Sequence, residues 1–162
     1  MRIDSVVADA SPLIILARGD LLHLLPQLFP EILIPAAVWA EIAAGGEADA
    51  AARELAAAEW AERVEVGELP ADVGAWNLGA GESEVLALAH RHAGRRAMVD
   101  DAAARACART LGIPVLGTGG ALVLAKRRGL LPSVTAALEV LRETGLWLSP
   151  GIELLLRQQA GE

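Results

Sequence analysis

The chain has 162 residues, 54% of them hydrophobic, and a formal net charge of −7 at pH 7. This length predicts one domain spanning residues 1–162, and no apolar run approaches the roughly 20 residues that a membrane span needs, so no membrane partner is expected. The negative charge argues against a protein that holds nucleic acid by bulk electrostatics alone. A single cysteine, Cys107, excludes an internal disulfide and favours a cytoplasmic location.

The first half of the chain alternates short apolar runs with stretches rich in alanine and leucine. Residues 3–8 are typical of a buried strand, and Ser11 with Pro12 predicts the N-cap and first turn of a helix. Gly19 divides the following stretch into two short helices. The sequence then predicts a strand, two helices and an exposed strand, at residues 31–35, 36–46, 47–60 and 62–70.

The second half continues this alternation. The predicted order is helix, strand, helix, strand and helix, at residues 79–94, 96–101, 101–112, 113–117 and 118–132, and the rest is helical to Gln159. Strands separated by helices favour a parallel sheet with helices on both sides, which is an α/β fold. In such folds the chemistry gathers at the carboxyl ends of the strands.

Several acidic residues stand at strand ends or near the starts of helices, namely Asp9, Glu41, Glu82, Glu84, Asp100 and Asp101. Carboxylates from separate elements that converge on one edge of a sheet repel one another and raise each other's pKa, unless a cation joins them. Mg²⁺ and Mn²⁺ prefer oxygen ligands. Because such an ion can activate water against a phosphodiester, the pattern supports metal-assisted phosphodiester hydrolysis.

Each carboxylate also has a structural explanation when it is taken alone. Asp9 suits a turn or a cap, Asp101 suits the N-cap of a helix beginning at Ala102, and Glu82 complements a helix dipole. The placement of the whole set on alternate elements is what favours a metal site. Glu84 either assists Glu82 or faces solvent, because a spacing of two residues points the side chains apart.

Two further features bear on function. The glycines of residues 117–120 lie between a strand and a helix, but they match neither common phosphate-binding glycine pattern, so tight packing is favoured there. Thr118 in this turn is a candidate contact for substrate or water. The tryptophans occur singly, including Trp147, and are typical of core or interface residues rather than stacking platforms.

Three segments resemble the PIN domain, and more narrowly the small prokaryotic proteins related to VapC-type toxins. They read "VVADASPLIILARGDLLHLLPQLFPEILIPAAVWAEI", "LGAGESEVLALA" and "MVDDAAARACARTLGIPVLGTGGALVLAKRRGLL". The second contains a GExE variant motif at residues 81–84, and the third a DD-x3-R variant motif at residues 100–105. The resemblance covers nearly the whole chain, with the motifs in the expected order.

The resemblance implies a three-layer α/β/α sandwich around a central parallel sheet, and a ribonuclease that depends on Mg²⁺ or Mn²⁺. The acidic positions of the family correspond to Asp9, Glu41, Glu82 and either Asp100 or Asp101, with a small hydroxyl residue at Ser11. The chain departs from the pattern at Glu82, where the toxins usually have aspartate. It departs again at Val99, where a threonine or serine is usual.

The leading hypothesis is therefore an endoribonuclease, and the resemblance suggests the toxin of a toxin–antitoxin pair. It implies an antitoxin protein that covers the acidic site, and an apolar helical face is expected to serve that partner or a homodimer. Two alternatives stay open. One is a non-catalytic PIN-like module that binds RNA or protein, and the other is an α/β enzyme that acts on a phosphorylated small molecule through the glycine turn.

Overall fold

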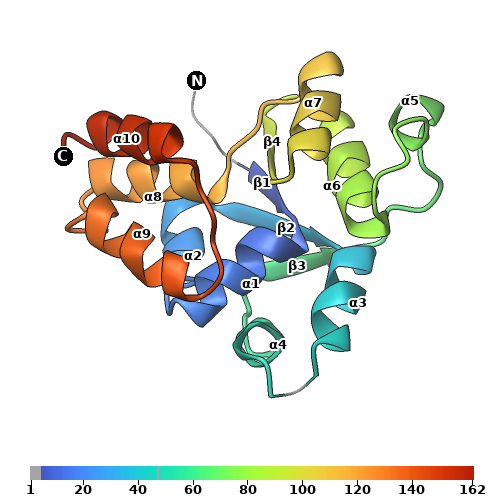
Figure 1. The fold of residues 1–162 in the computed structure, drawn as a ribbon. Coiled ribbons are helices and arrows are strands. Elements are labelled where there is room, and N and C mark those ends of the chain that lie inside the picture. Colours follow the sequence, from blue (N-terminus) through green and yellow to red (C-terminus); the bar gives the residue numbers. More distant parts are fainter. Residues whose placement is uncertain (1–4, 47) are drawn as a thin grey trace.

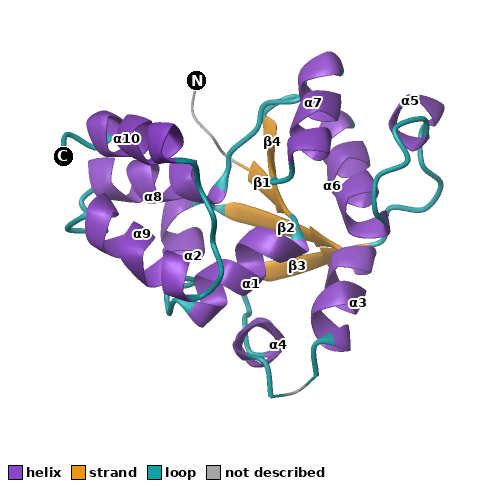
Figure 2. Cartoon of the chain, viewed as in Figure 1, coloured by secondary structure: helices purple, strands orange, loops and turns teal. Residues whose placement is uncertain are grey.

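The computed structural model describes residues 5–46 and 48–162, and within this part of the chain four parallel strands form one central sheet (Figure 2). The strand order is β3-β2-β1-β4, and every neighbouring pair is parallel. The strands are β1 (Ser5–Ala8), β2 (Glu31–Pro35), β3 (Ala61–Val64) and β4 (Arg95–Met98). The first two residues of the strand predicted at 3–8 lie outside the described residues.

The two central strands of the sheet, β1 and β2, are buried on both faces. Val6, Val7 and Ala8 of β1 have no exposed surface, and Ile32 and Ile34 of β2 are also buried. Side chains of successive strand residues point to opposite faces, so both faces must be covered by helices. The buried apolar residues form one continuous cluster that includes both layers of helices.

Helices form the two outer layers. The longer ones are α1 (Ala10–Arg18), α3 (Ala36–Ala44), α6 (Ala80–His90), α7 (Ala102–Thr110), α8 (Thr118–Arg127), α9 (Val134–Glu143) and α10 (Pro150–Gln159). The shorter ones are α2 (Leu24–Leu28), α4 (Ala50–Ala56) and α5 (Ala71–Gly74). Helix α6 packs on the sheet together with α3 and α7, whereas α2, α8 and α9 lie on the other side and α10 packs outside α8 and α9 (Figure 1). This arrangement confirms the predicted three-layer α/β/α fold with a central parallel sheet.

Several element predictions need correction. Ser11 does not cap the first helix, because Asp9 ends β1 and accepts a hydrogen bond from the Ala10 amide as the N-cap residue. The strand predicted at residues 113–117 is reduced to a single bridge between Val115 and Ala97. The turn into α8 follows at once, so the pairing cannot extend. The helix predicted at residues 47–60 covers only Ala50–Ala56 within the described residues, and the short α5 was not predicted.

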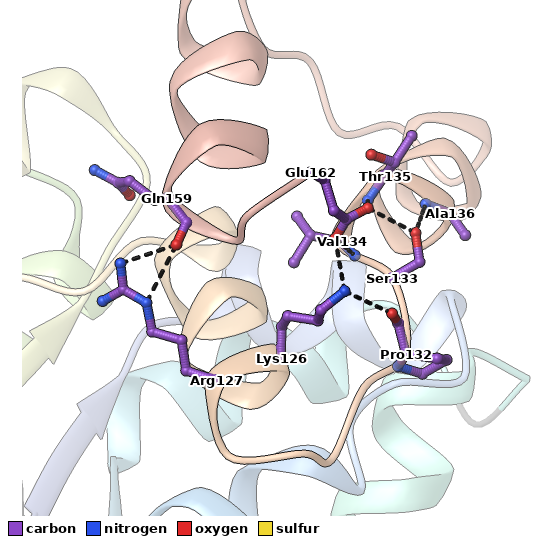
Figure 3. A network of polar contacts seen from close by, with 9 residues as sticks. All are labelled: Lys126, Arg127, Pro132, Ser133, Val134, Thr135, Ala136, Gln159 and Glu162. Carbon is purple, nitrogen blue, oxygen red and sulfur yellow. Dashed lines mark hydrogen bonds and ion pairs between the residues drawn. The ribbon is translucent and has the colours of Figure 1, made fainter.

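The last residue ties α10 to its neighbours (Figure 3). The Glu162 carboxylate accepts hydrogen bonds from the amides of Val134 and Thr135, at 2.6 and 3.1 Å, and from the Ser133 hydroxyl at 2.9 Å. Lys126 lies 3.4 Å from the same carboxylate. The side chain therefore caps the start of α9 from the far end of α10.

In the described part of the chain, no helix has the length and apolar character needed to cross a membrane.

Candidate active site

The site lies where β1 and β4 end side by side. Ala8 of β1 pairs with Met98 of β4, and the Asp9 amide donates a hydrogen bond to the Met98 carbonyl at 3.1 Å. From β1 the chain builds β2 and β3 in one direction and then returns to place β4 on the other side. Such a reversal of strand order leaves a crevice at the carboxyl ends of the two strands.

A cavity of about 390 Å³ opens at this crevice. It brings together five of the predicted site residues, which are Asp9, Ser11, Glu82, Asp100 and Asp101. Its other lining residues are Ile15, Gly145, Leu146 and Trp147. The cavity therefore has a wall of carboxylates and, from α1 and the loop before α10, an apolar wall.

Asp9 is the most deeply buried of the carboxylates, with 4% of its surface exposed. Burial is the largest cause that raises its pKa from an ordinary value of 3.8 to about 7. The hydrogen bond from the Ala10 amide, 2.8 Å long, lowers the pKa, but the neighbouring charges of Glu82, Glu41 and Asp100 raise it further. Asp9 is thus a carboxyl group on which several others converge.

Glu82 lies in the first turn of α6, half-buried against the same cavity. Burial is the main cause that raises its pKa, and the charges of Asp101 and Glu41 raise it as well. A neighbouring cation would offset the burial and repulsion at Glu82, just as it would at Asp9.

Glu41 reaches this group from α3, although it does not line the cavity and is itself exposed. A methyl group added at Gly81 would lie 2.5 Å from the Glu41 carboxylate and 3.4 Å from the Asp9 carboxylate. Because Gly81 has no side chain, the carboxylates of Glu41 and Asp9 can both approach its Cα. Sequence reasoning gave Gly81 no role, because the requirement depends on how α3 packs on α6.

Asp100 is held in place by the start of α8. Its two carboxylate oxygens accept hydrogen bonds from the Thr118 amide at 2.8 Å and from the Thr118 hydroxyl at 2.5 Å. Thr118 is fully buried, so its hydroxyl has no surface through which to reach a substrate. The Thr118 hydroxyl contacts the Asp100 carboxylate instead. Val99, where a threonine or serine is usual, is buried in the core, so the hydroxyl beside Asp100 comes from α8.

Asp101 has both a structural place and a place in the cavity. It is the N-cap residue of α7 and accepts a hydrogen bond from the Ala104 amide at 3.0 Å, as the capping alternative predicted. It also lines the cavity beside Asp100. Capping uses one oxygen, Oδ2, and Oδ1 has no hydrogen bond among the described residues.

Glu84 and the glycine turn belong to the packing of the fold. The Glu84 carboxylate accepts a hydrogen bond from the Ala37 amide at 3.2 Å, so this half-buried side chain caps the start of α3. At the glycine turn, the first amide of α8 is taken by Asp100. A side chain at Gly119 would lie 2.5 Å from Leu156. The turn is therefore tightly packed, as favoured above, and a phosphate cradle there would have to displace a carboxylate.

The carboxylates surround the cavity without closing on one point. Within residues 5–46 and 48–162, no three His, Cys, Asp or Glu side chains are grouped closely enough to hold a metal ion by themselves. Mg²⁺ usually keeps several waters and binds through one or two carboxylates. The donor set at the cavity consists of carboxylate oxygens with excess negative charge, and such oxygen ligands suit this type of ion.

The comparisons with known proteins give one family. No curated protein matches the chain. The family model for the PIN domain matches residues 5–162, which is almost the entire sequence and includes every residue of the cavity. The chain therefore belongs to the PIN-domain family.

Proposed function

We propose that this protein is an endoribonuclease that hydrolyses RNA phosphodiester bonds with Mg²⁺ or Mn²⁺. PIN domains are in general nucleases, so family membership indicates a nuclease-type activity. The observation that carries the finer proposal is the burial of Asp9 among Glu82, Glu41 and Asp100, which raises its pKa to about 7. A cation beside this group would stabilise its charged form, because it would offset both the burial and the mutual repulsion of the carboxylates.

Asp9 and Glu82 are the proposed principal metal-holding residues, because they face the same cavity and carry the raised pKa values. Asp100 and Asp101 would contribute from the same wall of the cavity and Glu41 from beside Gly81, directly or through water. When bound, a divalent cation lowers the pKa of a water molecule and stabilises negative charge on the phosphodiester.

The residues around the carboxylates have separate proposed tasks. Thr118 fixes the direction of Asp100, since it donates hydrogen bonds to both oxygens. Ser11 is exposed and lines the cavity, which supports a role as a hydrogen-bond donor to a phosphate oxygen. Arg105 and Arg109 line a neighbouring cavity of about 220 Å³, and a side chain at Gly117 would touch both Arg105 and Asp100. The proposed task of the two arginines is to bind RNA backbone near the carboxylates, in a salt-sensitive way.

The test is cleavage of a mixed set of structured RNAs in Mg²⁺, in Mn²⁺ and with chelator. Cleavage should require the metal and should fall by more than about 100-fold in Asp9→Asn, which loses a metal-holding charge. Asp72→Asn is the matched control, because Asp72 is an exposed aspartate outside the cavity. Metal-independent cleavage, or equal loss in both variants, would contradict the proposal.

A pair of glycine variants tests the geometry of the site without removing a carboxylate. Gly81→Ala should displace the Glu41 carboxylate, and we expect Mn²⁺ affinity and cleavage to fall by roughly 10-fold or more. Gly79→Ala, two residues earlier, has nothing within 4 Å of the added methyl group and should stay close to the unmodified protein. Calorimetric titration with Mn²⁺ measures the affinity of both variants. Equal affinities would show that Glu41 does not contribute to the metal site.

The alternative of a non-catalytic module is favoured by one observation, since Asp100 and Asp101 are both engaged at helix N-termini. That alternative predicts RNA or protein binding with no Mn²⁺ binding and no cleavage. The role as a toxin, the antitoxin partner and the homodimer stay predictions. A neighbouring gene for a small DNA-binding protein would support the first two, and sedimentation of the purified protein tests the third.

A further inference from the structure

One large aromatic side chain at the cavity is almost entirely exposed. Trp147 lies in the loop between α9 and α10 and has 81% of its surface exposed, more than any other large apolar residue exposed in the described part of the chain. The same residue lines the cavity that Asp9 and Asp100 share. Of the two expectations for this residue, core or interface, the exposure excludes the core and leaves most of the indole uncovered.

The backbone on both sides of Trp147 is anchored. The Leu146 amide donates a hydrogen bond to the Leu141 carbonyl at 3.0 Å, and Leu146 itself is buried. Leu148 packs against the core on the other side, and the Ser149 hydroxyl accepts a hydrogen bond from the Ile152 amide as α10 begins. The side chains of Leu146 and Leu148 therefore pack inward, and Trp147 between them stays exposed at the cavity.

The two walls of the cavity match the two chemical parts of a nucleotide. The carboxylates of Asp9, Glu82, Asp100 and Asp101 form the wall at which a cation and a phosphate would bind. Ile15, Leu146 and Trp147 form an apolar wall, and of these only Trp147 presents a flat aromatic face. A nucleobase stacks on such a face whatever its sequence, because every base has a π-face.

We propose that Trp147 stacks on an unpaired base of the nucleotide beside the scissile phosphate. This inference rests on the proposed nuclease function. Within a duplex both faces of each base are covered by neighbouring bases, and a stacking residue can reach only unpaired ones. A protein partner is the less favoured occupant, because it would have to desolvate the carboxylates while it covered the indole.

The experiment compares three variants on a random-sequence RNA strand and on the same strand paired with its complement. Trp147→Ala removes the aromatic face, Trp147→Phe keeps one, and Leu155→Ala is the control because Leu155 is an exposed apolar residue of α10 outside the cavity. We expect Trp147→Ala to raise KM for the single strand by roughly 5- to 100-fold, with a smaller change in kcat. Trp147→Phe should recover most of the loss, and Leu155→Ala should show none.

Quenching of tryptophan fluorescence by the single strand, in Mn²⁺, gives a readout that does not need cleavage. The quenching should be strong in the unmodified protein and largely lost in Trp147→Phe, which retains Trp39, Trp60 and Trp76. An unchanged KM in Trp147→Ala, a preference for the duplex, or equal effects of Trp147→Ala and Leu155→Ala would each overturn the inference. Quenching at Trp147 without any cleavage would uphold the stacking while the nuclease proposal failed, and absence of both would overturn the two together.

Discussion

At the scale of single residues, the buried carboxyl group of Asp9 links the stability of the protein to pH. Its pKa in the folded protein is about 7, above the ordinary value of 3.8, so the folded state holds a proton that the unfolded chain releases earlier. The corresponding stability is fully present below about pH 4. It is lost as the pH rises through about 7, where Asp9 becomes charged among other carboxylates.

We therefore expect Asp9→Asn to be more stable than the unmodified protein at pH 8 in chelator, by about 2–4 kcal/mol. Asparagine keeps an acceptor for the Ala10 amide but carries no charge. At pH 4 the difference should nearly disappear. Urea unfolding at the two pH values measures it, and Mn²⁺ should restore stability at pH 8 only to the unmodified protein. A pH-independent difference would mean that the charge of Asp9 is not the cause.

The positions of the acidic residues in the site were partly predictable from the sequence, and their contacts were not. Asp9 and Asp100 follow apolar runs, and residues that end neighbouring parallel strands meet at one edge. The capping of α3 by Glu84 joins residues 47 positions apart, and the exposure of Trp147 depends on how α9 and α10 pack. The periodicity of the sequence indicates which face of a helix is buried, but not which distant residue packs against that face. Contacts between distant residues therefore could not be predicted from it.

At the scale of elements, α10 is attached through the Glu162 carboxylate. Hydrogen bonds, above all from the Val134 amide, lower the pKa of this group from 4.5 to about 2. The stability that it contributes is present above about pH 4.5, because the folded state then holds a charge that the helix N-terminus favours. That contribution is lost as the pH falls toward 2.

We expect Glu162→Gln to loosen α10 at neutral pH while the sheet stays folded. The amide side chain is neutral and has one acceptor oxygen where the carboxylate has two, so it cannot satisfy Val134, Thr135 and Lys126 together. Hydrogen exchange of the α10 amides should quicken severalfold, whereas the amides of β1 and β4 keep their protection. Exchange that quickens equally in the sheet would show that α10 is not a separate unit.

Predictions of elements succeeded at the central strands and the helices that flank them, and failed at residues 113–117 and at α5. The strand at residues 31–35 appears as predicted, whereas the strand predicted at residues 96–101 is found at Arg95–Met98 and ends three residues earlier. The helices on either side of both strands lie close to their predicted bounds. The strand predicted at residues 113–117 pairs at one position only, and α5 has four residues, too few to show a helical period. Asp9 replaced Ser11 as a cap because the end of β1 fixed where α1 begins.

At the scale of the whole molecule, one cluster of buried apolar residues includes both helical layers and the sheet. The organisation as one domain is still a prediction, and the continuous core implies that unfolding is a single cooperative transition. Far-UV circular dichroism and tryptophan fluorescence should give coincident urea curves, since Trp39 and Trp60 pack against the same core. Two separated transitions would divide the chain into independent units.

The engagement of Asp100 and Asp101 at the starts of α8 and α7 has a consequence for reading other sequences of this family. Each of these aspartates stabilises the start of a helix in addition to any catalytic role. Substitution of either one would therefore destabilise the fold, and would be selected against even in a protein that had lost its activity. An intact aspartate pair in a related chain is therefore a record of a preserved architecture and a poor marker of a working enzyme. Glu41 is exposed on α3 and makes no hydrogen bond among the described residues, so its substitution would cost little stability. The absence of this glutamate from a related sequence is therefore a better sign of lost activity than the state of the aspartate pair.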